Sequence, residues 1–76
     1  MSVTMKVTLR SLREEAGLSV MELAYQARLS VPTIYRMENG TNGVTRITAQ
    51  KVLNVLSKAL DRKIALDSLE IKLIER

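Results

Sequence analysis

The sequence predicts a small all-α protein of four to five short helices, with short extended segments allowed at its two ends. Two observations lead to this fold class. Apolar residues recur three or four positions apart along most of the 76 residues, which is the helical period. Serine or threonine precedes several of these stretches and glycine follows two of them, as helix caps do. We expect a single domain over 1–76, because a chain of this size forms only one thin core.

The first segment alternates apolar and polar residues with a period of two, which indicates extended backbone. Its apolar members are Val3, Met5 and Val7. Thr8 is a suitable N-cap for a first helix, and Gly17 is expected to end that helix in the left-handed backbone conformation. The apolar residues of this helix share one side: Leu9, Leu12 and Ala16.

Two short helices separated by about three residues are expected next. Ser19 and Glu22 form a capping box, in which each side chain bonds the backbone N–H of the other residue. Ser30 is the N-cap of the second of these helices, and Pro32 fits its first turn, where no N–H is needed. Asn39 and Gly40 close that helix. The residues expected to face inward are Val20, Leu23, Ala24, Ala27, Ile34 and Met37.

A loop over 41–44 leads to a longer helix over about 46–60. The apolar side of this helix consists of Ala49, Val52, Leu53, Leu56 and Leu60, flanked by Val55 and Ala59. The last segment, 61–76, allows two interpretations. The favoured one is a single helical turn near 66–69 followed by extended chain. The alternative is a strand over 71–73 that pairs with the N-terminal segment.

Segment 61–76 contains more apolar residues than a tail that packs on nothing would need. They are Ile64, Leu66, Leu69, Ile71, Leu73 and Ile74. These side chains either complete the core of the monomer or form the interface of a homodimer. Dimerisation would place two equivalent helices about one turn of DNA apart and would require a roughly palindromic site.

The composition excludes several function classes. The absence of cysteine and histidine removes disulfides, Cys/His zinc sites, thiol nucleophiles and imidazole bases, so we expect no enzyme, no metal site and no cofactor. No apolar run approaches the ~20 residues of a membrane-spanning helix, and 1–10 lack the pattern of an export signal. We therefore expect a cytoplasmic protein with neither a membrane nor a small-molecule substrate as partner. The net charge of +4 is compatible with nucleic-acid binding.

Two short helices joined by about three residues are the geometry of a helix-turn-helix, here over about 19–39. The close crossing of the two helices requires a small contact residue, which Ala24 supplies. Apolar residues are expected to fill the angle between them: Leu23, Ala27, Leu29, Ile34 and Met37. The start of the second helix has side chains free to enter a DNA major groove: Val31, Pro32, Thr33, Tyr35 and Arg36.

The stretch LRSLREEAGLSVMELAYQARLSVPTIYRMENG, residues 9–40, resembles the phage-repressor-like (Cro/XRE-type) helix-turn-helix DNA-binding family. The shared features are the opening L-R-x-x-R-x-x-x-G-L-S, the E-L-A of the second helix, the S-x-x-T-I-x-R of the recognition helix and the closing E-N-G. Many positions agree at fixed spacing. The resemblance implies a lambda-repressor-like fold and a regulator that binds double-stranded DNA.

The resemblance also implies roles for single residues. Arg13 and Glu38 match a structural pair that fixes the recognition helix. The positions of family members that read bases are occupied by Val31, Pro32 and Arg36. The positions associated with the DNA backbone are occupied by Ser30, Thr33, Asn39, Thr41 and Arg46, the last of which some relatives direct toward the minor groove. From its chemistry, Tyr35 is added to this set, and Arg36 is suited to a bidentate contact with guanine.

Two positions depart from the family pattern. Val20 stands where a glutamine often contacts a phosphate, and Arg28 stands where the turn usually has glycine. Arg28 must adopt a positive φ at a cost of roughly 1 kcal/mol, or the turn must differ. These departures motivate an alternative function, a protein–protein interaction module on the same fold. Its apolar contact surface would consist of Val20, Val31, Pro32 and Tyr35.

Overall fold

The computed structural model describes residues 7–40, 43–71 and 73–74. Four α-helices dominate this part of the chain, which confirms the all-α prediction: α1 (Leu9–Glu15), α2 (Val20–Ala27), α3 (Val31–Asn39) and α4 (Arg46–Ala59). Two-residue strands lie near the ends of the described chain, β1 (Val7–Thr8) and β2 (Leu69–Glu70), and a 3₁₀ turn over Leu66–Ser68 precedes β2. The extended terminal segments are thus also present.

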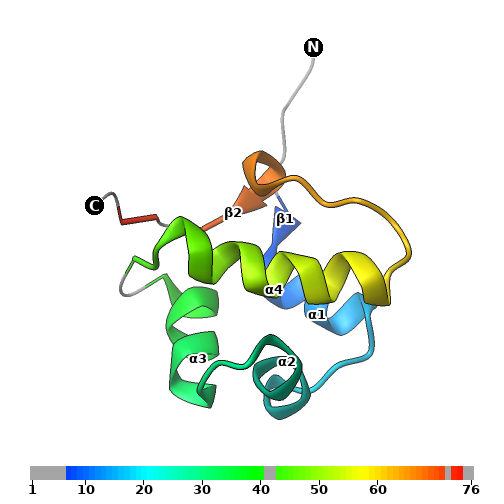
Figure 1. Cartoon of the computed structure of the whole chain (residues 1–76), viewed down its shortest axis with the longest axis horizontal. Coiled ribbons are helices and arrows are strands. Elements are labelled where there is room, and N and C mark those ends of the chain that lie inside the picture. The colour runs from blue at the N-terminus through cyan, green and yellow to red at the C-terminus, as the bar shows by residue number, and fades with distance from the viewer. Residues whose placement is uncertain (1–6, 41–42, 72, 75–76) are drawn as a thin grey trace.

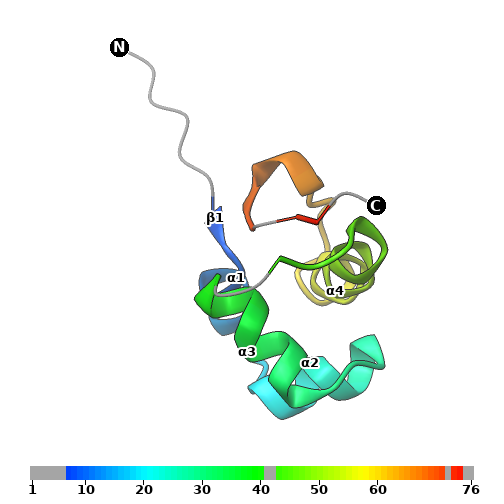
Figure 2. The same cartoon turned by 90° about the vertical axis from the view of Figure 1, so that its left-hand side faces the viewer.

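The helices surround one apolar core. α2 packs against both α3 and α4, and α1 packs against α3. The pair of strands lies on the side of α4 opposite to α2, as both views show (Figures 1 and 2). The buried side chains come from every helix and from the C-terminal segment: Leu9, Leu12, Leu23, Ala24, Ala27, Ile34, Met37, Ala49, Val52, Leu53, Leu56, Ile64 and Leu69.

A capping side chain begins each helix, as the sequence predicted for the first three. The N-caps are Thr8, Ser19, Ser30 and Thr45, and each hydroxyl accepts a hydrogen bond from the backbone N–H three residues later. Gly17 follows α1 with φ 74° and Gly40 ends α3 with φ 68°, the left-handed conformation in which glycine avoids a Cβ clash. Local chemistry therefore accounts for most helix boundaries.

The C-terminal segment completes the core of this chain. Ile64 and Leu69 are buried, and three further apolar residues pack against the core while half-buried: Leu66, Ile71 and Leu73. Ile74 is the exception, with 45% of its surface exposed. Of the two interpretations of these six residues, core completion therefore accounts for five.

The strand pairing differs from the alternative offered by the sequence. β1 and β2 pair in parallel, with Val7 opposite Leu69 and Thr8 opposite Glu70, so Val7, the described member of the N-terminal set, pairs with Leu69 and not with 71–73. Leu73 instead forms a bridge with Val44. The reason is that the 3₁₀ turn ends directly at Leu69, whose side chain enters the core and brings its backbone beside β1. Val3 and Met5 lie outside the described residues.

Because of the capping box of α2, the stability of the fold is expected to vary with pH in the acid range. The Ser19 backbone N–H donates to the Glu22 carboxylate at 2.8 Å, and this bond holds the pKa of that carboxyl below its usual 4.5. A lowered carboxyl pKa stabilises the fold above pH 4.5, and this contribution disappears as the pH falls through the folded-state pKa.

Replacing Glu22 with glutamine tests this dependence, because glutamine can make the same bond without titrating. We therefore expect the stability advantage of the wild type over Glu22→Gln to be constant above pH 4.5 and to shrink below it. Urea unfolding at a series of pH values measures this difference, and an advantage that did not change with pH would contradict it.

Candidate nucleic-acid interface

The connection between α2 and α3 fixes their crossing. Ala24 is buried in the contact, as its small size predicted. Arg28 follows α2 with φ 60° and ψ 45°, so of the two alternatives raised by the sequence the arginine takes the left-handed conformation. This conformation costs an L-residue about 1–2 kcal/mol. Leu29 donates its N–H to the Ala24 carbonyl at 2.8 Å, which turns the chain sharply into the Ser30 cap.

α3 has an inward and an outward side. Ile34 and Met37 are buried, and Val31 is half-buried against the core. The outward side chains are exposed: Pro32, Tyr35, Arg36 and Asn39. Val31 therefore offers less of its side chain to a partner than the sequence predicted, because its position on α3 turns it toward the other helices.

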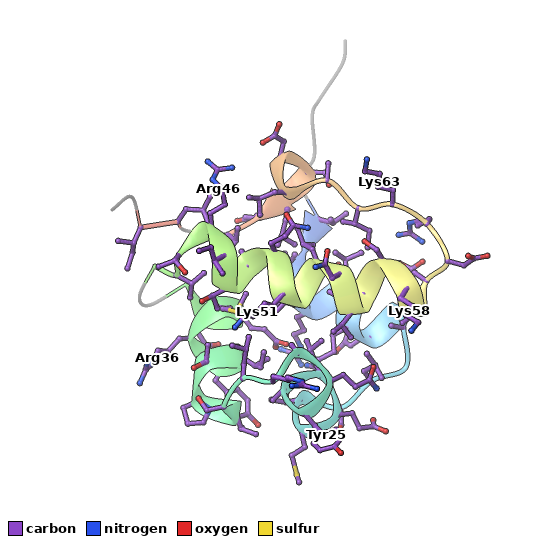
Figure 3. All side chains as sticks on the ribbon, viewed as in Figure 1. Tyr25, Arg36, Arg46, Lys51, Lys58 and Lys63 are labelled. Carbon is purple, nitrogen blue, oxygen red and sulfur yellow. The ribbon has the colours of Figure 1, made fainter. Side chains whose placement is uncertain are left out.

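Arg36 is placed to contact a partner outside the molecule. Its side chain extends away from α3 and from the other helices (Figure 3). None of the ion pairs found among the described residues includes Arg36. Five N–H groups of its guanidinium are thus available for an external acceptor.

The two hydroxyl groups at the start of α3 form a hydrogen bond with each other. Ser30 Oγ lies 2.8 Å from Thr33 Oγ1 and also accepts the Thr33 backbone N–H at 3.3 Å. This network caps α3 and defines the direction of its first turn. Ser30 is exposed and Thr33 half-exposed, so both hydroxyls remain within reach of a ligand that approaches this end of the helix.

Arg13 of α1 and Glu38 of α3 form a close ion pair. Arg13 Nε donates to Glu38 Oε2 at 2.6 Å and Nη2 to Oε1 at 3.3 Å, while Nη1 donates to the Leu18 carbonyl at 3.1 Å. The two side chains are 13% and 7% exposed. The hydrogen bond to Glu38 is the main reason that the pKa of Arg13 is raised. The pair ties α3 to α1 and neutralises the carboxylate within α3.

The excess of positive charge near the helix-turn-helix lies on α4, which packs against α2. Glu38 is the only acidic residue of α3, and α4 has three basic residues and no acidic one. Arg46 is the first residue of α4, where the positive end of the helix dipole disfavours a cation. Arg46 and Arg36 both lie toward the left-hand side of Figure 3, on neighbouring elements. Neither arginine has a carboxylate partner among the described residues.

The remaining predicted residues fall into two groups. Asn39 is exposed at the end of α3, whereas Thr41 lies outside the described residues. The structure also reveals candidates that the sequence did not single out as DNA contacts: Arg28, Lys51, Lys58 and Lys63 are exposed and form no ion pair within the described ranges. These four cations differ from the paired basic residues only in having no carboxylate close enough for an ion pair. The fold decides which carboxylates lie close, so the sequence did not single them out.

Other kinds of site find little support in the part of the chain that the structure describes. No group of three or more acidic, cysteine or histidine side chains there is arranged to hold a metal ion. None of the described helices is long and apolar enough to span a membrane.

The helix-turn-helix class of DNA-binding regulators is defined by two short crossed helices joined by a close turn, with an outward basic residue on the second helix. A family model described as a helix-turn-helix domain matches residues 7–62. The chain belongs to this family, as its resemblance to the phage-repressor-like proteins predicted. No curated protein and no solved structure matches the chain.

Proposed function

We propose that the protein is a sequence-specific transcriptional regulator that inserts α3 into the major groove of DNA. The observation that carries this proposal is the arrangement of α3. Its inward side is held by the core and by the Arg13–Glu38 pair, while its outward side leaves Arg36 exposed. A rigid helix with a free basic side chain is suited to reading base edges.

Within this proposal, each candidate residue has a chemical role. Arg36 donates two hydrogen bonds to O6 and N7 of a guanine. Pro32 and the exposed part of Val31 have no donor and contact a thymine methyl group. The DNA backbone contacts are assigned to Ser30, Thr33, Tyr35, Asn39, Thr41 and Arg46. The proposal involves no catalytic step, cofactor or small-molecule substrate.

One copy of α3 reads only a few base pairs, so we propose that the protein acts as a homodimer. Two copies would place their recognition helices roughly 34–36 Å apart on a palindromic site. A cytoplasmic location follows from this role in a cell whose DNA is in the cytoplasm.

Selection of bound DNA from a random pool tests the proposal. We expect enrichment of one motif that contains a guanine next to a thymine, with two inverted half-sites. Failure to retain any DNA at ~50 mM salt, where electrostatic binding is strong, would contradict DNA binding altogether. Enrichment without a motif would contradict sequence specificity.

Arg36→Ala is expected to weaken binding to the selected site roughly 5- to 150-fold, corresponding to 1–3 kcal/mol for one bidentate contact. It should also remove the preference for guanine at one position. Fluorescence anisotropy on the selected duplex and on single-base variants measures both effects. Lys63→Ala is the matched control, because Lys63 is also exposed but lies across the molecule from Arg36 (Figure 3). Equal losses for the two variants would argue against base reading by Arg36.

The alternative function, a protein–protein module, has a smaller surface than the sequence predicted. Val20 and Val31 are half-buried against the core of the same chain, which leaves Pro32 and Tyr35 of the four proposed contact residues. The DNA selection experiment separates the two functions, because a protein-binding module retains no DNA at low salt.

A further inference from the structure

The same turn follows α1, α2 and α4, and its left-handed position is occupied by glycine, arginine and aspartate respectively. The first two of these turns have nearly the same sequence and lead into the next helix. Residues 16–19 are Ala-Gly-Leu-Ser and residues 27–30 are Ala-Arg-Leu-Ser. After α1, Leu18 N–H donates to the Arg13 carbonyl, and after α2, Leu29 N–H donates to the Ala24 carbonyl, both five residues back. The central residue has φ 74° in Gly17 and φ 60° in Arg28. In both turns the serine that follows is the N-cap of the next helix.

Glycine is the residue that suits this backbone, since it has no Cβ to clash in the left-handed conformation. Gly17 follows that preference, and Asp61 is of a residue type that tolerates the left-handed conformation, whereas Arg28 is not. Backbone strain of this kind persists where the surrounding structure holds the chain in place, and it is concentrated at functional sites. The side chain of Arg28 is therefore a candidate for a functional contact.

No contact among the described residues explains the arginine. Arg28 is exposed, and no ion pair or side-chain hydrogen bond of the described residues includes it. Three other arginines do form such contacts: Arg10 with Glu14, Arg13 with Glu38 and Arg62 with Glu15. A free guanidinium at a strained position is available for a ligand.

The surroundings of Arg28 indicate an anionic ligand. Arg28 lies two residues before Ser30, the N-cap of α3. The connection between α2 and α3 and helix α4 lie on the same side of the molecule, at the right of Figure 2. In Figure 3, Lys51 is drawn below α4, toward α2 and α3, and it also forms no ion pair within the described ranges. α4 has no carboxylate to neutralise it.

We propose that Arg28, assisted by Lys51, binds the phosphodiester backbone of DNA beside the major groove that α3 occupies. This inference rests on the proposed function and adds a backbone contact to it. A phosphate accepts charge-assisted hydrogen bonds from a guanidinium, which is how arginine compensates for the strained turn. Because phosphates are the same at every base pair, this contact strengthens binding without selecting a sequence.

Arg28→Gly separates this role from a structural one. We expect the variant to be more stable, with a melting temperature higher by roughly 4–8 °C, because the strain is relieved. We also expect it to bind the selected duplex roughly 3- to 10-fold more weakly, the effect of one hydrogen bond. The slope of log affinity against log salt should fall by about one, and the loss should be equal on mutated sites.

Three variants sharpen the test. Arg28→Lys retains the cation and the strained backbone, so its salt slope should equal that of the wild type. Lys51→Gln should lower the slope in the same way as Arg28→Gly, whereas Lys63→Gln, across the molecule from α3, should leave it unchanged (Figure 3). A stabilised Arg28→Gly with wild-type affinity and slope would overturn the inference while leaving the proposed function intact. Absence of DNA binding by the wild type would overturn both.

Discussion

Replacing Glu38 with leucine is expected to lower the free energy of unfolding by up to about 3–5 kcal/mol, the cost of leaving one member of a mostly buried ion pair without its partner. Arg13 is only 13% exposed, and without the carboxylate its charge would have one remaining acceptor, the Leu18 carbonyl. For a chain of this size, whose total stability is on the order of 0.1 kcal/mol per residue, this loss is a large fraction. Urea unfolding followed by circular dichroism measures it.

A double-mutant cycle identifies the cause of this loss. Arg13→Met alone should cost a similar amount, because it leaves the mostly buried Glu38 charged and without a partner. The double variant should recover most of the stability, as apolar replacements of buried pairs do. Glu14→Leu is the matched control in an exposed pair, since Arg10 and Glu14 are 70% and 59% exposed. We expect at most about 0.5 kcal/mol for that control. Additive losses in the cycle would show that the two residues do not act as a pair.

Leu69→Ala is expected to cost about 2–5 kcal/mol, as large-to-small changes in a packed core do. Leu69 is 2% exposed and is the point at which the C-terminal segment enters the core beside β1. The loss should be the same at low and high protein concentration, because the residue packs within its own chain. Urea unfolding at two protein concentrations measures both properties.

Ile47→Ala is the control for Leu69→Ala, because Ile47 is also a large aliphatic residue but is 73% exposed. A change within about 0.5 kcal/mol is expected there. If Leu69→Ala left the stability of the monomer unchanged and weakened only a concentration-dependent association, the C-terminal segment would be an interface between copies. The homodimer of the proposed function would then use this segment.

The candidate interface was only partly predictable from the residues. The outward positions of Pro32, Tyr35 and Arg36 follow from their spacing on a helix whose start is marked by Ser30. The half-burial of Val31 does not follow, because it depends on how closely the core approaches the first turn of α3. Arg28 and Lys51 were not predicted as DNA contacts either, since a basic residue is recognised as unpaired only when its neighbours in space are known.

What the sequence by itself determined is the set of helices and their caps. Ser19 and Ser30 bond to groups three residues away, and Gly17 and Gly40 adopt conformations that their own lack of a side chain permits. Such interactions depend on near neighbours in the chain, so they can be predicted from them. They also defined the helix-turn-helix before any tertiary contact was considered.

The tertiary structure alone decided how the ends of the chain meet and what Arg28 does at its turn. The sequence offered a strand over 71–73 as its alternative, whereas the structure pairs Leu69 with Val7, because the side chain of Leu69 enters the core beside β1. Arg28 could have altered the turn or accepted strain within it. The packing of α2 against α3 and α4 keeps the turn in place, so the backbone of Arg28 takes the strained conformation that glycine would have adopted freely.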